Sequence, residues 1–136
     1  MEDQDIHLVM QSFGRCTLTD DFLVTFYETL TRSSDEIAAM FAKTDMPSQR
    51  RLLKEGMIRL IAYASDNDFA VQRVKELGQS HSRTQLNVRP EMYEIWVDSL
   101  IEAIRQHDPE CSDELKAAWR RIVAPGIAAM QELYSQ

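Results

Sequence analysis

The stretch Phe69-Ala-Val-Gln-Arg-Val-Lys-Glu-Leu-Gly-Gln-Ser-His81 ends on a histidine that continues an apolar helical pattern. Val71, Val74 and Leu77 recur at the spacing of one helix face, and His81 follows Leu77 by four further residues. The pattern therefore predicts that the imidazole lies on the inward face of a helix. A lone histidine there is either a core residue with satisfied hydrogen bonds or a metal ligand. The second alternative gains weight from the segment 27–53, which could supply the opposite wall of a pocket.

The length and composition indicate one globular domain, residues 1–136. A chain of 136 residues buries roughly two-thirds of its unfolded surface, which is enough for a core and an internal pocket. Four glycines and four prolines leave little room for a turn-rich β fold. Every substantial segment instead has the helical period, and none alternates convincingly. We therefore expect an all-α fold.

The charge and cysteine content exclude several classes of partner. The net charge is −7 and the largest basic cluster is Gln49-Arg50-Arg51, so we expect no nucleic-acid partner. No apolar run approaches membrane-spanning length, and the acidic start is unlike a signal peptide, so we expect no membrane partner. Cys16 and Cys111 form neither a CxxC motif nor a disulfide-rich pattern. We therefore expect reduced thiols in a cytoplasmic protein.

Turn and capping signals divide the chain into about seven helices of unequal length. The signals fall at Thr17 or Thr19, at 33–36, at 42–46 before Pro47, at 66–68, at 82–88 before Pro90, at 107–109 and at Ser112. The threonine, the 33–36 segment and Ser112 are predicted N-caps, and both prolines are predicted first helical residues. Pro125 lies inside the last helix and predicts a kink. Helices of such unequal length favour an irregular helical sandwich over a symmetric four-helix bundle.

Five short motifs follow one another at intervals that carry a family resemblance. They are Thr25-Phe-Tyr27-Glu-Thr-Leu, Met40-Phe41, Gln49-Arg-Arg-Leu-Leu53, Arg89-Pro-Glu-Met-Tyr93 and Ala117-Ala-Trp119. Together they resemble a bacterial single-domain globin, similar to the haem domain of flavohaemoglobins and globin-coupled sensors, over nearly all of the chain. The interval from Gln49 to His81 also fits the distal-to-proximal separation of that family. The resemblance implies a globin fold, with about seven helices that enclose a haem pocket. A slip of one turn would put Leu52 or Leu53 in place of Gln49.

The resemblance implies that the chain binds haem b, with His81 as the iron ligand through Nε2. The other ring nitrogen would donate a hydrogen bond to a backbone carbonyl of Gly78-Gln-Ser80. Tyr27 and Gln49 would donate hydrogen bonds to O₂, NO or CO on the distal side. The cofactor contacts expected from the resemblance are Phe41, Leu53, His81, Leu86, Tyr93 and Trp96.

The function implied by the resemblance is reversible O₂ binding at a pentacoordinate iron, for sensing, storage or scavenging. Flavohaemoglobins also have a glutamate on the last helix, and the only acid near that position here is Glu132. We therefore expect a binding protein rather than an enzyme. One alternative is a haem-free regulatory module, against which the joint presence of His81 and Tyr27 argues. Another is a haem protein that removes nitric oxide or peroxide with an external reductase, because we expect no reductase domain in this chain. The last two helices could also pair in a homodimer, and a separate partner protein could carry a signal.

Overall fold

The computed structural model describes residues 2–65 and 67–135, which form seven helices and no strand. The helices are α1 (Glu2–Cys16), α2 (Asp21–Ser33), α3 (Asp35–Met40), α4 (Met46–Ala64), α5 (Asp68–Ser80), α6 (Met92–His107) and α7 (Asp113–Glu132). This arrangement confirms the all-α prediction. Asp66, which belongs to the predicted turn at 66–68, lies outside the described residues.

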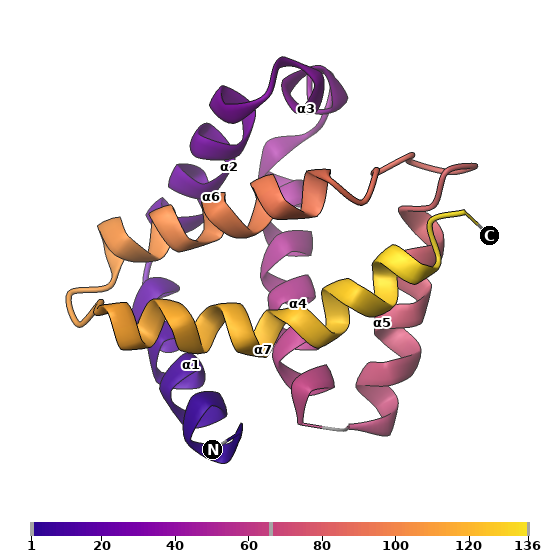
Figure 1. The fold of residues 1–136 in the computed structure, drawn as a ribbon. Coiled ribbons are helices and arrows are strands. Elements are labelled where there is room, and N and C mark those ends of the chain that lie inside the picture. Colours follow the sequence, from indigo (N-terminus) through magenta and orange to yellow (C-terminus); the bar gives the residue numbers. More distant parts are fainter. Residues whose placement is uncertain (1, 66, 136) are drawn as a thin grey trace.

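The helices form layers that cross one another, as an irregular sandwich requires. Figure 1 shows α6 and α7 side by side, with α7 crossing α1 and α4 and with α6 crossing α2. The same figure shows α5 beside α4, and α5 also packs on α7. The short helix α3 packs on α2 at the end of the molecule farthest from the N-terminus.

Side-chain caps begin three of the helices. The hydroxyl of Ser34 accepts a hydrogen bond from the Ile37 amide at 3.2 Å, and that of Ser112 accepts one from the Leu115 amide at 3.1 Å. Asn67 caps α5 in the same way. Each cap satisfies an N–H group that has no partner within its helix. The predicted caps in the 33–36 segment and at Ser112 are therefore confirmed.

The predicted cap of the second helix was wrong. Asp20 holds the N-cap position of α2 and makes no side-chain capping bond. The hydroxyl of Thr17 instead donates to the Phe13 carbonyl at 2.7 Å, which extends the end of α1. Thr19 lies one residue before the N-cap position, and its hydroxyl accepts a hydrogen bond from the Asp21 amide at 3.3 Å. The connection between α1 and α2 is thus longer than a cap at either threonine would make it.

The prolines stand close to the predicted helix starts but not on them. Pro47 is the second residue of α4, which begins at Met46. The helix α6 begins at Met92, two residues after Pro90, because the amides of Met92 and Tyr93 bond to carbonyls only three residues back and close a turn. The helix α7 continues through the exposed Pro125, and its second half changes direction in Figure 1.

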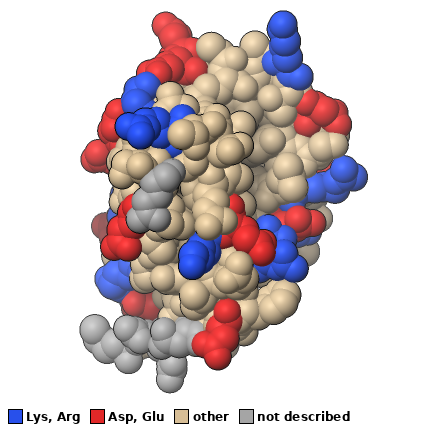
Figure 2. All heavy atoms as spheres, turned by 90° about the vertical axis from the view of Figure 1, so that its right-hand side faces the viewer, with Lys and Arg blue, Asp and Glu red and all other residues tan. Residues whose placement is uncertain are grey.

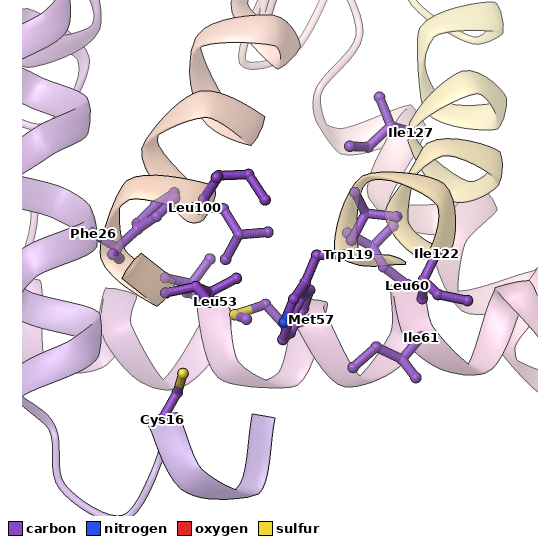
Figure 3. Packing of buried hydrophobic residues seen from close by; sticks show 14 of the residues in the cluster. Cys16, Phe26, Leu53, Met57, Leu60, Ile61, Leu100, Trp119, Ile122 and Ile127 are labelled. Carbon is purple, nitrogen blue, oxygen red and sulfur yellow. The ribbon is translucent and has the colours of Figure 1, made fainter. Parts of the chain in front are cut away.

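The core lies where α2, α4, α6 and α7 meet. Figure 3 shows Leu53 and Met57 of α4 among Phe26, Leu100 and Trp119, which come from the other three helices. Every one of these side chains is buried. Burial of such apolar surface is the main favourable term in folding.

The inward face of α5 differs by one residue from the predicted face. The buried positions are Ala70, Val74 and Gly78, whereas Val71 is 43% exposed. The reason is that α5 faces α4 and α7 together, and the backbone of Gly78 comes close to Met130 of α7. Val71 then lies to the side of this contact.

A buried polar network fixes α1 to the corner between α6 and α7. Asp108 accepts hydrogen bonds from the Ser12 hydroxyl at 2.6 Å and from two nitrogens of Arg15, of which Nε lies 2.7 Å away. The indole of Trp119 in turn donates to the Ser12 oxygen at 3.0 Å. The Glu110 amide also donates to Asp108 Oδ1 at 2.9 Å. Burial raises the pKa of Asp108, but these four hydrogen bonds and the charge of Arg15 outweigh it and lower the pKa below its usual value.

The surface carries charges of both signs. Figure 2 shows Lys and Arg interspersed with Asp and Glu on one face, with uncharged residues between them. Within residues 2–65 and 67–135, no helix combines the length and the apolar character that a membrane crossing requires.

Candidate functional site

A cavity of about 400 Å³ opens between the helix layers and receives residues from α2 to α7. Its volume lies in the usual range for the binding site of a small molecule. Most of the wall is apolar. Every residue predicted for the site lies in this wall: Tyr27, Phe41, Gln49, Leu53, His81, Leu86, Tyr93 and Trp96.

His81 follows the last residue of α5 and occupies its C-cap position. Its Nδ1 atom lies 2.6 Å from the carbonyl oxygen of Leu77, which also accepts the His81 backbone amide at 3.0 Å. A carbonyl oxygen only accepts hydrogen bonds, so Nδ1 carries the proton and Nε2 keeps a free lone pair. The predicted acceptor within 78–80 was wrong, because the C-cap position places the ring over the carbonyl one full turn back.

Burial keeps the His81 imidazole neutral. Desolvation lowers the pKa of His81 below its usual value, and the hydrogen bond to Leu77 opposes this shift. A neutral imidazole with a free Nε2 lone pair is the form in which histidine binds a metal. His81 thus combines the protonation state and the tautomer of a ligand.

Tyr27 and Gln49 meet at another part of the wall. The side-chain amide of Gln49 donates to the Tyr27 hydroxyl oxygen at 3.1 Å and so links α4 to α2. This contact brings Gln49, rather than Leu52, to the tyrosine, although both α4 residues reach the cavity. Desolvation raises the pKa of Tyr27 to about 12, so its hydroxyl stays protonated at neutral pH.

An aromatic cluster holds the Tyr27 ring in place. The ring packs edge to face with Phe41 at 5.4 Å and with Phe26 at 5.1 Å between centroids. Trp96 packs on Phe26 in the same manner at 5.5 Å. Edge-to-face contacts favour one relative orientation of the rings. The Tyr27 hydroxyl is therefore held at the cavity wall beside Gln49.

Several wall residues were not predicted from the sequence. They are Leu30, Ile37, Met40, Leu52, Gly56, Arg59, Leu60, Leu77, Ser80, Val88, Met92, Ile127 and Met130. The helical spacing from Leu53, which was predicted, could have indicated two further wall positions, Gly56 and Leu60. Ile127 and Met130 could not have been found in this way, because only the packing of α7 on α4 and α5 brings them to the cavity.

Comparison with known proteins places the chain in a family. The family model for globins matches residues 24–130. The chain is a globin. A solved structure from Pseudomonas aeruginosa PAO1, described as structurally highly homologous to a human haemoglobin, is 39% identical to it. The match has a TM-score of 0.93 and covers 97% of this globin and 99% of that chain. No curated protein matches the chain.

These matches confirm the predicted resemblance to bacterial single-domain globins. Globins generally hold haem, and the cavity of this globin fits that group by its donor set. Among the described residues no three His, Cys, Asp or Glu side chains come together as a site for a free metal ion. The cavity instead offers one neutral imidazole in a mostly apolar wall. Such a set would suit haem, for which His81 would supply the protein ligand and the apolar side chains the surrounding contacts.

Proposed function

We propose that this globin binds haem b through His81 and reversibly holds O₂, and also NO or CO, beside Tyr27 and Gln49. The observation that carries the proposal is the presence of a neutral imidazole and a tyrosine–glutamine pair in the wall of one apolar cavity. Bound haem would supply an iron that can hold a diatomic gas. His81 would hold that iron through Nε2, which its Nδ1 bond to Leu77 leaves free.

The chain's own residues determine how the site behaves. Leu77 fixes the tautomer and the ring orientation of His81 through the 2.6 Å bond to Nδ1. Phe41, Leu53, Leu86, Tyr93 and Trp96 provide apolar contacts for the cofactor and limit the access of water. Tyr27 and Gln49 are the hydrogen-bond donors for a gas molecule that carries partial negative charge. Each such bond contributes roughly 1 kcal/mol or more in a dry site.

Two donors in an apolar cavity favour retention of O₂ over rapid release. The proposed role is therefore O₂ sensing, storage or scavenging rather than bulk delivery. A haem-free regulatory module explains the cavity less well, because an empty apolar cavity of about 400 Å³ destabilises a fold. Removal of nitric oxide or peroxide with an external reductase would use the same residues. Measurements of turnover with a reductase present distinguish this function from simple binding.

The test is a titration of the purified protein with haem b, followed by absorption spectroscopy. We expect a Soret band that saturates at one haem per chain. The spectrum of the reduced protein should shift reversibly when O₂ or CO is added. Absence of a specific Soret band after haem addition would overturn it. Bovine serum albumin, titrated in parallel, controls for non-specific haem binding.

A further inference from the structure

Arg89 joins the connection between α5 and α6 to the separate helix α3. Its Nη2 atom donates to Glu36 Oε1 at 2.7 Å, and Nη1 donates to Glu36 Oε2, so the pair is bidentate. The remaining nitrogen, Nε, donates to Glu91 Oε1 at 2.6 Å. Arg89 and Glu36 are 53 residues apart in the sequence. A bidentate arginine–carboxylate pair is the strongest and most directional form of ion pair between side chains.

The connection that carries Arg89 is bonded closely to His81. The Val88 amide donates to the His81 carbonyl at 2.9 Å, and the Asn87 amide donates to the Ser82 carbonyl at 2.8 Å. Val88 immediately precedes Arg89. A displacement of Arg89 from α3 would therefore be transmitted to the His81 backbone through the Val88 amide.

The other edge of this connection is held by the end of α7. The Arg83 amide donates to the Tyr134 carbonyl at 2.8 Å, and the Gln131 side chain donates to the Pro90 carbonyl at 3.1 Å. The connection is thus fixed along α7, and the Glu36–Arg89 pair ties it to α3. Breaking that pair would free the α3 side while the α7 side stayed in place.

Both segments that the ion pair joins contribute to the cavity wall. The α3 side provides Met40 and Phe41, and the connection provides Leu86 and Val88. Met40 is 38% exposed and Leu86 is 60% exposed, so these two residues lie at the margin where the cavity reaches the surface. The Glu36–Arg89 pair therefore bridges two sides of the cavity margin.

We propose that the Glu36–Arg89 pair is a clasp that holds this margin closed and slows the escape of haem from the cavity. The inference rests on the proposed function, because it takes haem as the occupant. Escape of a large flat molecule requires α3 and the connection to move apart, and the clasp opposes this movement. Glu36 and Arg89 are positioning residues in this proposal, since they act through the segments that line the cavity.

The test is the rate of haem transfer from the loaded globin to excess haem-free myoglobin. Glu36→Gln and Arg89→Gln should each raise this rate roughly two- to fivefold, the range expected for an exposed ion pair. The double variant should be no faster than the faster single variant, because either change breaks the same contact. The wild-type rate should also rise with salt, whereas the variant rates should not.

Two matched variants control for a general loss of surface charge. Glu91→Gln removes a partner of Arg89 within the connection and leaves the link to α3, and Glu102→Gln breaks the exposed pair with Arg105 on α6. Both should transfer haem at the wild-type rate. Unchanged rates in the Glu36 and Arg89 variants, fully additive effects, or equal increases in the controls would each overturn the proposal.

A second measurement separates failure of the clasp from failure of haem binding. Hydrogen exchange of the Val88 amide in the haem-free protein should be two- to fivefold faster in Glu36→Gln than in the wild type and unchanged in Glu102→Gln, roughly matching the transfer rates. This result does not depend on haem. If the wild type binds no haem, the proposed function fails whatever the exchange shows; if haem binds but Val88 exchange is unaffected, the clasp fails.

Discussion

Gln49 donates its side-chain amide to the hydroxyl oxygen of Tyr27 across 3.1 Å, which makes the tyrosine the acceptor in this pair. The Tyr27 proton is therefore not used by Gln49 and is available for a ligand in the cavity. Because burial raises the pKa of Tyr27 to about 12, the hydroxyl keeps this proton at neutral pH. The pair thus presents the Tyr27 hydroxyl as a donor oriented by Gln49, and the second amide hydrogen of Gln49 remains as a further donor.

Replacement of Tyr27 by phenylalanine should speed O₂ release from the haem-loaded, reduced protein. The change removes the hydroxyl and keeps the ring contacts with Phe41 and Phe26. Loss of a hydrogen bond of about 1 kcal/mol or more corresponds to a roughly fivefold or greater rise in the dissociation rate, measured by stopped flow. Gln49→Leu should give a smaller rise, because Gln49 also acts by orienting Tyr27. An unchanged rate in both variants would show that the pair does not contact the ligand.

Acidification should destabilise the haem-free protein through His81. Burial lowers the pKa of His81 in the folded state, so the unfolded state binds more protons as the pH falls below the unfolded value of about 6.5. The stabilising contribution is therefore present above that pH and is lost below it. Urea unfolding at pH 7.5 and 5.5 should show a larger loss of stability for the wild type than for His81→Gln. Equal losses in the two proteins would contradict the proposed burial of a neutral imidazole.

The close approach of α5 to α7 should make Gly78 intolerant of a side chain. A Cβ atom at this position would lie 2.7 Å from Leu133 Cδ1 and 3.1 Å from the backbone Cα of Met130. Gly78→Ala should therefore lower the free energy of unfolding by about 1–3 kcal/mol. Gly14→Ala is the control: its Cβ would meet nothing within 4 Å, and alanine is the better helix former, so it should stabilise by about 0.5–1 kcal/mol. Chemical denaturation checks both values, and equal effects would contradict the close packing of α5 on α7.

The buried carboxylate of Asp108 should contribute far more to stability than an exposed one. Asp108→Asn removes the negative charge of the carboxylate. That carboxylate accepts hydrogen bonds from two nitrogens of Arg15 and from the Ser12 hydroxyl. The expected loss is about 1.5–3 kcal/mol in the free energy of unfolding. Asp98→Asn breaks the exposed pair with Arg120 and should cost less than about 1 kcal/mol. A similar cost for the two variants would mean that the network does not hold α1 to the α6–α7 corner.

Features governed by local chemistry could be predicted from the sequence. The helical period indicated the helices, and Ser112 could be identified as a cap because its partner is only three residues away. The spacing of Tyr27, Gln49 and His81 was informative because the resemblance supplied a known order of helices around a pocket. These residues do line one cavity in the structure.

Features that depend on packing between distant segments could not be predicted. Val71 faces outward because the packing of α7 determines which side of α5 is covered. The sequence of residues 69–81 does not indicate where α7 lies. The acceptor of His81 is Leu77 because the ring occupies a C-cap position, which depends on where α5 ends. The Glu36–Arg89 pair joins residues from separate elements, and no local motif marks it.

Replacement of His81 by glycine, with imidazole added, tests most directly whether His81 holds the haem iron through Nε2. Without imidazole, the reduced haem-loaded variant should lose the five-coordinate histidine spectrum that is expected for the wild type. Free imidazole should enter the space left by the side chain and restore that spectrum. A His81→Gly spectrum identical to that of the wild type before imidazole is added would contradict the assignment.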